Sequence, residues 1–250
     1  MQIEVKNKKQ DFFAVITDVD IKNISNTNFV KIKQTLETYG VVVLKNQNIN
    51  DNQQIEFSRK FGDLEKALEH DKLEGIQDEI TRISNVDQHN NILPADSKKV
   101  IYDRGNRSWH SDSSYKSIPS KFSILSSREI PDQGGGTEYI DARYALETWN
   151  KKKHKLSLED LKEQICEHSI VYSRMVNTGD IFDESYKNKM PFVKQRLIRT
   201  HPFTQRSAFY VGSHCSHIVG WDIEISRKLI KEINDWIVNS GEIIHHKWSN

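Results

Sequence analysis

The chain has 250 residues, with 36 Lys and Arg against 35 Asp and Glu, so its formal net charge is +1. This near balance excludes a general binder of nucleic acid, which needs a basic stripe or patch. The length suits one domain with a sizeable core, and no apolar run approaches the roughly 18 residues of a membrane span. The two cysteines, Cys166 and Cys215, form no CxxC motif, which argues against a disulfide framework and favours a reducing cytoplasm.

The first part of the chain predicts two strands with a helix between them. Residues 12–16 and 41–44 are short apolar runs of the kind found in buried strands. Apolar residues recur at helical spacing between the two runs, after the potential caps Asn26 and Thr27. Gly40 stands where a helix commonly ends on a glycine.

Asp51 is expected to cap a second helix, which Gly62 would close. Residues 63–108 are polar and weakly patterned, with one expected strand at 80–83. A segment this long without strong periodicity is typical of a lid over a functional site, with disorder as the alternative.

From residue 109 onward, short strand-like runs alternate with helices but follow no regular βαβ rhythm. This pattern favours a β-roll decorated by helices over a doubly wound sheet. Strands are expected at 109–115, 121–128, 137–140, 168–173, 196–200 and 208–213. Helices are expected at 141–149 and 157–166, followed by a final amphipathic helix from Ile225 to Trp236.

A histidine and an aspartate stand two positions apart in the run Trp109–Tyr115. On a strand, side chains at i and i+2 point to the same face, so His110 and Asp112 would project together. An imidazole and a carboxylate are two members of the 2-His-1-carboxylate triad, which binds Fe(II) and leaves positions open for co-substrates. Because such pairs also arise by chance, a hydrogen-bonded His–Asp pair remains the alternative on these two residues alone.

Seven motifs, in order along nearly the whole chain, carry a family resemblance. On these motifs the chain resembles the taurine dioxygenase family of Fe(II)/2-oxoglutarate-dependent dioxygenases, and within it the 2,4-dichlorophenoxyacetate dioxygenase branch. The motifs are Tyr39–Gln47, Phe57–Glu65, Trp109–Ser114, Gly135–Glu138, His168–Arg174, Arg199–Pro202 and His245–Trp248.

The resemblance implies one catalytic domain over residues 1–250 and an α+β, mainly β fold. That fold is a double-stranded β-helix (jelly roll, clavaminate synthase-like) with flanking helices. The implied activity is hydroxylation of a small organic anion, similar to an aryloxyacetate or a sulfonate, with release of succinate and CO2. Fe(II) would be the cofactor, with 2-oxoglutarate and O2 as co-substrates. The implied partners are a small molecule and, as in other family members, further copies of the chain, rather than nucleic acid or a membrane.

Carried over residue by residue, the resemblance makes His110 and Asp112 iron ligands. It makes Thr137 a donor to the distal carboxylate of 2-oxoglutarate, as a buried carboxylate requires. Three residues match substrate-side positions: Asn106, Ser114 and Lys66. The alternative for Thr137 is an ordinary strand threonine. For Asn106, Ser114 and Lys66 the alternatives are a turn asparagine, a strand serine and a solvated lysine.

The chain also departs from the family pattern. The family's third ligand, a second histidine, and the arginine that clamps 2-oxoglutarate would follow the residues that match His246–Trp248, but the sequence ends at Asn250. We therefore expect the final strands of the roll to be missing from these 250 residues. A non-catalytic remnant or binding protein of the same fold is one alternative. A zinc hydrolase that uses the same pair is another, although no HExxH spacing accompanies it.

Overall fold

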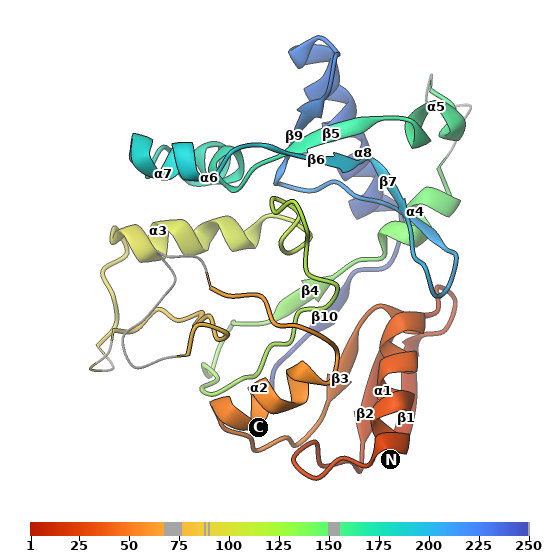
Figure 1. Ribbon diagram of the computed structural model, residues 1–250, viewed down its shortest axis with the longest axis vertical. Coiled ribbons are helices and arrows are strands. Elements are labelled where there is room, and N and C mark those ends of the chain that lie inside the picture. Colours follow the sequence, from red (N-terminus) through yellow and green to blue (C-terminus); the bar gives the residue numbers. More distant parts are fainter. Residues whose placement is uncertain (68–76, 88, 90, 150–155, 250) are drawn as a thin grey trace.

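A computed structural model of the protein describes residues 1–67, 77–87, 89, 91–149 and 156–249 (Figure 1). Its helices are α1 (Asn26–Tyr39), α2 (Asp51–Arg59), α3 (Lys98–Arg104), α4 (Ala142–Glu147), α5 (Leu158–Lys162), α6 (Ile170–Thr178), α7 (Glu184–Lys189) and α8 (Ile223–Ser240), with a 3-10 turn, η2 (Gly105–Arg107), after α3. Its strands are β1 (Gln2–Asn7), β2 (Phe12–Thr17), β3 (Val42–Leu44), β4 (Thr137–Tyr139), β5 (Ile165–His168), β6 (Val193–Arg196), β7 (Ile198–Thr200), β8 (Ser207–Phe209), β9 (Cys215–Ile218) and β10 (Ile244–His246).

The N-terminal sheet forms one end of the molecule. Strand β2 pairs antiparallel with β1 and parallel with β3, and α1 makes the crossover that a parallel pair requires. Helix α1 begins after Ser25, whose side chain accepts a hydrogen bond from the backbone N–H of Asn28. It ends at Gly40, which has a left-handed φ of 74° and whose N–H bonds to the carbonyl of Leu36. The core beneath this sheet contains Ile16, Ile21, Ile32, Ile49 and Phe57.

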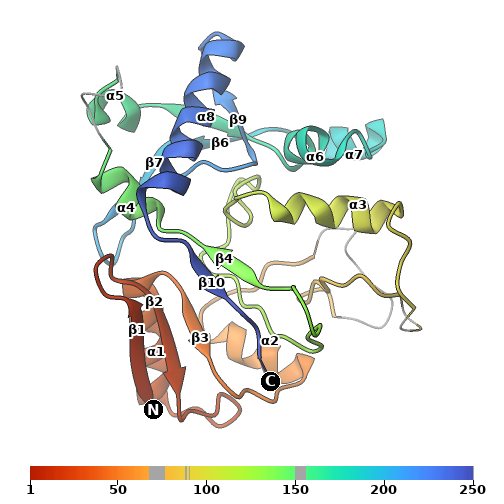
Figure 2. The ribbon, with the colours of Figure 1, turned by 180° about the vertical axis from the view of Figure 1, so that it is seen from behind.

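Three smaller sheets make up the rest of the fold. Strand β5 lies between β6 and β9, β7 pairs with β8, and β4 pairs with β10, all antiparallel. The β4–β10 pair lies between the N-terminal sheet and the β6–β5–β9 sheet (Figures 1 and 2). The long helix α8 packs on β9 and α4. The core of this part includes Leu161, Cys166, Leu197, Ile218 and Ile233, each fully buried.

A buried arginine joins these two parts of the fold. Arg143 on α4 donates from Nε and Nη2 to the two carboxylate oxygens of Asp141, at 2.8 and 2.9 Å. Its Nη1 donates to the carbonyl of Thr38 on α1 at 2.8 Å, and Nη2 also reaches the carbonyl of Asp11. The two-point pairing with a carboxylate compensates the buried charge.

The predicted elements of the N-terminal part are confirmed as β2, α1, β3 and α2. Both helix caps lie one residue earlier than predicted. Ser25 caps α1, and Asn50 caps α2 because it forms a reciprocal capping box with Gln53. Helix α2 ends near Lys60, before the glycine that was expected to end it.

The middle of the chain differs from the prediction more than the N-terminal part does. Residues 80–83 form no strand, and residues 98–107 form the unpredicted α3 and η2. Residues 109–128 also contain no strand. For the predicted strand 109–115 the reason is a turn: Ser113 adopts a left-handed φ of 55°, and its carbonyl accepts the N–H of Lys116. The remainder of the predicted lid, residues 68–76, 88 and 90, lies outside the described residues.

After residue 136, most predicted elements are confirmed in type, and most of them are shorter than predicted. They are the elements at 137–140, 141–149, 196–200 and 208–213 and the final helix. The prediction of a strand over 168–173 is wrong. Strand β5 ends at His168, and Ser169 then caps α6 by accepting the N–H of Tyr172. The predicted helix 157–166 is only α5, because its last residues enter β5.

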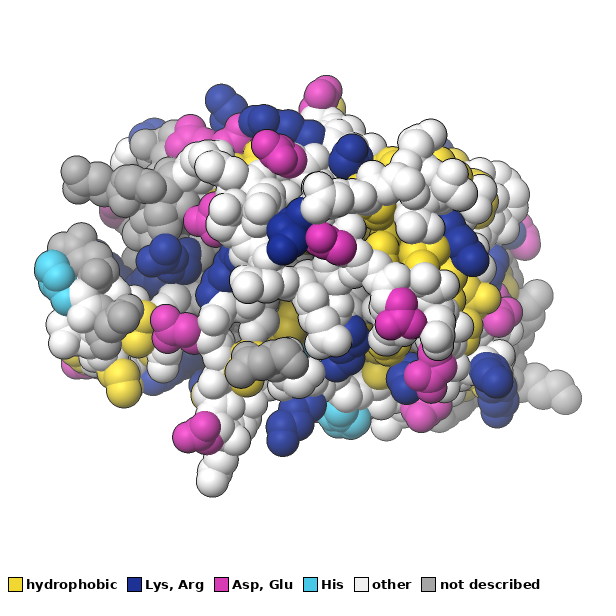
Figure 3. All heavy atoms as spheres, turned by 90° about the horizontal axis from the view of Figure 1, so that it is seen from below, with side chains coloured by type: hydrophobic (Ala, Val, Ile, Leu, Met, Phe, Trp, Pro, Cys, Tyr) yellow, Lys and Arg dark blue, Asp and Glu magenta, His cyan; other side chains and the backbone are white. Residues whose placement is uncertain are grey.

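The surface agrees with the balanced composition. Acidic and basic side chains are interspersed on the face shown in Figure 3, without a field of one sign. None of the described helices is both long and apolar enough to cross a membrane.

The glycine that ends α1 offers a test of the N-terminal part. We expect Gly40→Ala to lower the free energy of unfolding by about 1 kcal/mol, because a Cβ disfavours the left-handed backbone. Neighbouring atoms lie no closer than 3.5 Å to the added Cβ, so the cost is conformational rather than steric. Thermal unfolding would show a midpoint about 2–4 °C lower. Asparagine tolerates this conformation better, so equal losses in Gly40→Ala and Gly40→Asn would contradict the explanation.

Candidate metal site

The predicted pair, His110 and Asp112, comes together in the structure although it does not lie on a strand. The Nε2 atom of His110 lies 3.2 Å from Oδ1 of Asp112. On the other side of the ring, Nδ1 lies 2.7 Å from the carbonyl oxygen of Ser108. Both side chains are partly accessible, with exposed fractions of 24% and 54%. The pair therefore presents a nitrogen and an oxygen to the same small volume at the surface of the fold.

The carbonyl of Ser108 determines the tautomer of the imidazole. A carbonyl oxygen only accepts, so Nδ1 of His110 carries the hydrogen and donates it at 2.7 Å. Without a metal, the hydrogen bond with Asp112 raises the pKa of His110, and the same bond lowers the pKa of Asp112. In the neutral ring the lone pair is on Nε2, the atom that faces the carboxylate. A histidine that binds a metal is commonly oriented in this way by its second nitrogen.

The geometry of the pair fits a metal ion. Two donor atoms that are each about 2.1 Å from an ion, at right angles, lie about 3 Å apart. The observed separation of 3.2 Å between Nε2 of His110 and Oδ1 of Asp112 is close to this value. Imidazole nitrogen and carboxylate oxygen are also the donors that non-haem Fe(II) centres use. The described residues contain no group of three His, Cys, Asp or Glu that could hold a metal, so they supply two protein ligands.

His214 lies beside the pair without joining it. Its ring centroid is 5.6 Å from that of His110 and 4.9 Å from that of Tyr115. Burial lowers the pKa of His214 to about 3, with a contribution from the nearby charge of His110. His214 is therefore a neutral imidazole, and its buried Nδ1 has no hydrogen-bond partner in the described part of the protein. It is a neutral polar side chain packed beside His110.

The backbone of residues 109–110 is held against a neighbouring segment. The N–H of Ser213 donates to the carbonyl of Trp109 at 2.8 Å. Gly212, with φ 117°, permits this approach, since a Cβ there would lie 3.0 Å from Cα of His110 and 3.1 Å from the carbonyl oxygen of Trp109. The close packing fixes the start of the candidate metal-binding turn (residues 109–116) without a β-ladder.

The end of the same turn is tied to the segment that follows α2. The carboxylate of Glu65 accepts hydrogen bonds from the hydroxyls of Ser113 and Ser120 and from the ammonium of Lys116. Partial burial raises the pKa of Glu65, but these donors outweigh it, and the pKa lies below its usual value. The ionised carboxylate thus holds the residue that follows Asp112 in its left-handed conformation.

The other predicted site residues are placed as follows. Thr137 on β4 accepts a hydrogen bond from Nε1 of Trp248 at 3.0 Å. Asn106 in η2 is exposed and accepts from Nη2 of Arg174 at 2.7 Å. Ser114 is buried, whereas Lys66 is exposed at the edge of the described residues and makes no hydrogen bond there. Of the three substrate-side residues, the structure therefore packs Ser114 behind the turn and leaves Asn106 and Lys66 exposed.

Behind Ser114 lies a stack of groups to which the sequence assigned no role. Oγ of Ser114 lies 3.2 Å from Nδ1 of His168, and the His168 ring stacks on Tyr210 with centroids 5.7 Å apart. The guanidinium of Arg199 lies 4.6 Å from the Tyr210 ring centroid. Burial and the nearby charge of Arg199 lower the pKa of His168 to about 4. His168 and Arg199 stand in family-like motifs, but no spacing rule marks either one as part of this stack.

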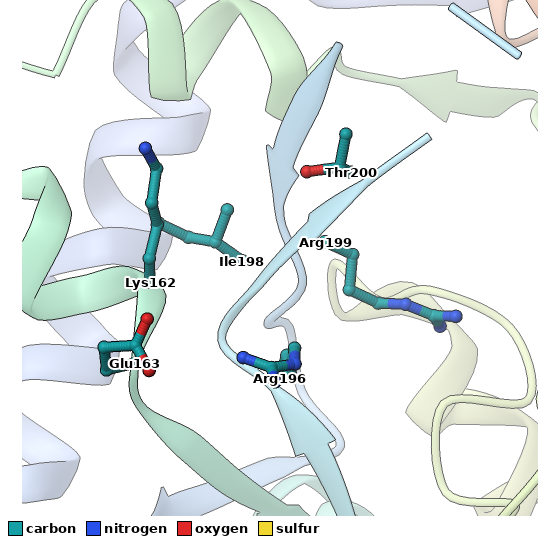
Figure 4. Close-up of a pocket in the computed structure, with 6 residues that line it drawn as sticks. All are labelled: Lys162, Glu163, Arg196, Ile198, Arg199 and Thr200. Carbon is teal, nitrogen blue, oxygen red and sulfur yellow. The ribbon is translucent and has the colours of Figure 1, made fainter. Parts of the chain in front are cut away.

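A surface hollow of about 460 Å³ lies on the other side of Arg199. It is lined by Lys162, Glu163, Arg196, Ile198, Arg199 and Thr200, which come from α5 and its end and from β6 and β7 (Figure 4). The hollow includes neither His110 nor Asp112, and it holds no adjacent imidazole and carboxylate. The hollow therefore lacks the donor pair of the candidate metal site, which lies in the turn that carries His110 and Asp112.

The buried imidazole of His168 predicts a sensitivity to acid. The folded state keeps this ring neutral down to about pH 4, whereas the unfolded chain protonates it near 6.5. The free energy of unfolding should therefore fall by up to about 1.4 kcal/mol per pH unit between those values. Urea unfolding at pH 6.5 and 4.5 should show a smaller acid loss for His168→Gln than for the unsubstituted protein. His245→Gln, at a 70% exposed side chain, is the control, and equal acid losses in all three proteins would contradict the prediction.

The chain is similar to known proteins over nearly its whole length. Residues 5–250 match the family described as "Taurine catabolism dioxygenase TauD, TfdA family". The chain is 29% identical, over 95% of its length and 83% of the relative, to an alpha-ketoglutarate-dependent 2,4-dichlorophenoxyacetate dioxygenase of Cupriavidus pinatubonensis. It is 27% identical, over 95% and 80%, to an (S)-phenoxypropionate/alpha-ketoglutarate-dioxygenase of Sphingobium herbicidovorans.

A solved structure extends the similarity to the fold. AAD-2, crystallised with Mn(II) and N-oxalylglycine, superposes with a TM-score of 0.87 at 28% identity, covering 99% of this chain and 86% of AAD-2. The family match over residues 5–250 and the shared fold lead to one assignment. The chain belongs to the TauD/TfdA family of alpha-ketoglutarate-dependent dioxygenases.

Proposed function

We propose that the protein is an Fe(II)- and 2-oxoglutarate-dependent dioxygenase that hydroxylates a small organic anion. The overall reaction converts a C–H bond, O2 and 2-oxoglutarate into C–OH, succinate and CO2. The observation that carries the proposal is the convergence of His110 Nε2 and Asp112 Oδ1 at 3.2 Å, with the Nδ1 hydrogen held by Ser108. A non-catalytic remnant of the same fold is not favoured, because its relatives are named as dioxygenases.

His110 and Asp112 hold the ferrous ion in this proposal. When bound, Fe(II) supplies the activation of O2 that is coupled to the oxidative decarboxylation of 2-oxoglutarate. The protein's own contribution is to orient the two ligands, to bind 2-oxoglutarate and the substrate, and to exclude water. Ser108 and Glu65 contribute to the first task, because they fix the imidazole and the turn before any ligand arrives.

Thr137 is proposed to donate its hydroxyl hydrogen to a carboxylate of 2-oxoglutarate. In the structure this oxygen accepts from Trp248, so its own hydrogen remains available. Asn106 and Ser114 belong to the substrate side, and Lys66 would do so only by a movement of its exposed side chain. The substrate is proposed to be an aryloxyalkanoate or a sulfonate. Hydroxylation of a carbon that bears an ether oxygen or a sulfonate would release that group.

The whole chain is proposed to form one catalytic domain. We propose a jelly roll whose final strands, with the third histidine ligand and the arginine that pairs with 2-oxoglutarate, lie outside these 250 residues. The two thiols, Cys166 and Cys215, are free, which is consistent with a cytoplasmic enzyme. Assembly into homo-oligomers is part of the same proposal.

The metal ligands provide the direct test. We expect Asp112→Ala and His110→Ala to weaken Fe(II) binding at least roughly tenfold, since loss of even an outer partner of a ligand costs that much. Succinate formation in the presence of phenoxyacetate should fall to background in both variants. Fe(II) affinity by anaerobic titration and succinate by chromatography are the measurements.

His245→Ala is the matched control, because His245 is an exposed histidine that pairs with Glu138 on β4. It should leave Fe(II) affinity unchanged. Succinate that stays at background with every aryloxyalkanoate and sulfonate tested, in protein that binds Fe(II), would refute the proposed activity. Unchanged Fe(II) affinity in Asp112→Ala would refute the site.

A further inference from the structure

Two arginines of the described chain are buried, and they are satisfied in different ways. Arg143, 9% exposed, forms the two-point pair with Asp141 that joins the two parts of the fold. Arg174 on α6 is only 3% exposed, and among the described residues it has no carboxylate partner. A buried guanidinium normally requires a paired anion, so the second arginine lacks a partner that the first one has.

The contacts of Arg174 account for only part of its hydrogen-bonding capacity. Nη2 donates to the amide oxygen of Asn106 at 2.7 Å, and the guanidinium lies 4.4 Å from the ring centroid of Tyr102. Its Nε is buried, and no described residue forms a hydrogen bond with it. The plane rests so closely on Gly105 that a Cβ at that glycine would lie 2.4 Å from Nη1. The guanidinium is thus fixed in one orientation by neutral groups, with donors left over.

The position of Arg174 relates it to the metal-binding turn. Asn106 precedes His110 by four residues, and Ser173, next to Arg174, donates its hydroxyl to Ser213 in the segment that packs on the turn. The positive charge of Arg174 contributes to the low pKa of His214 and opposes the rise in the pKa of His110 that Asp112 causes. We propose that Arg174 is the guanidinium that binds the carboxylate of the organic substrate, in place of the carboxylate partner that the described residues do not provide.

This inference rests on the proposed dioxygenase function, and it assigns the substrate rather than 2-oxoglutarate to Arg174. Thr137, the expected partner of 2-oxoglutarate, is on β4. Strand β4 and helix α6 lie at different heights of the molecule, with the yellow-green segment around residue 110 between them (Figures 1 and 2). Thr137 and Arg174 therefore come from elements on different sides of the segment that carries His110.

A series of aromatic rings begins at Tyr102, the ring that contacts the guanidinium. Tyr102 contacts Phe182 with centroids 6.1 Å apart, and Phe182 stacks on Tyr186 at 4.4 Å. All three side chains are half-buried. Apolar ring surface beside a fixed positive charge suits an acid with an aromatic body. An aryl-substituted carboxylate is the class of substrate that this arrangement fits.

Calorimetric titration of the metal-free protein tests the inference without turnover. The probes are phenoxyacetate, its neutral analogue phenoxyacetamide, and N-oxalylglycine as a stand-in for 2-oxoglutarate. In Arg174→Gln we expect affinity for phenoxyacetate to fall about tenfold or more, as for loss of a charged hydrogen bond. Affinity for phenoxyacetamide and N-oxalylglycine should change less than about twofold. Arg174→Lys keeps the charge without the planar fork and should be intermediate.

Arg107→Gln is the matched control, because Arg107 is an exposed arginine of η2, the turn on which Arg174 packs. This variant should bind all three probes normally. Circular dichroism reports whether the variants fold, and the lysine variant keeps the test open if the glutamine variant unfolds. Three outcomes would overturn the inference: no preference of the unsubstituted protein for the acid over the amide, an equal loss of acid and amide, or a loss confined to N-oxalylglycine. Preferential binding of the acid that depends on Arg174, without any succinate formation, would support the inference while refuting the proposed function.

Discussion

The candidate site depends on one constraint: an irregular turn must hold an imidazole and a carboxylate about 3 Å apart without a β-ladder to support it. The two donor atoms lie 3.2 Å apart, and the left-handed Ser113 follows them directly. Order is imposed from outside, by Gly212 and Ser213 at the start of the turn and by Glu65 at its end. These contacts come from segments more than 40 residues away on either side, so the metal site is a product of the tertiary fold rather than of local structure.

The electrostatics around the turn follow from the same packing. Fully buried His168 and nearby His214 are kept neutral, because burial outweighs any gain from protonation. His110 is more exposed and has a carboxylate neighbour, so its pKa moves in the opposite direction. Three histidines in one region thus have distinct states. Only His110 combines an accessible Nε2 with a neighbouring carboxylate and a carbonyl that fixes the tautomer, which is why it, and neither buried histidine, is suited to a cation.

The sequence predicted that the side chains of His110 and Asp112 lie together, and they do, but for a reason that the structure does not share. The i, i+2 argument assumed a strand, whereas the side chains meet across the beginning of a turn. Local signals worked where local physics decides: Gly40 ends α1, and the apolar periodicity of α8 is confirmed. They failed where tertiary contacts decide, as at 168–173, where capping by Ser169 converts an apolar run into α6. The roles of Glu65 and Arg174 could not be predicted, because a carboxylate after a helix and an arginine within an apolar run have no spacing that reveals a distant partner.

The contrast between the two buried arginines shows how such a group can be interpreted. Arg143 is stabilised by Asp141 within its own element, and its task is to join α4 to α1. Arg174 is held in place by an amide, an aromatic ring and the bare backbone of Gly105, none of which neutralises its charge. Such an arrangement orients a cation but leaves its buried charge unpaired. A fold tolerates the cost of an unpaired charge most readily where a bound ligand will pair with it. The same α6 that carries this cation also packs, through Ser173 and Ser213, on the segment that fixes the metal-binding turn. In the proposed enzyme, one short helix would therefore couple the binding of the substrate's charge to the geometry of the metal ligands.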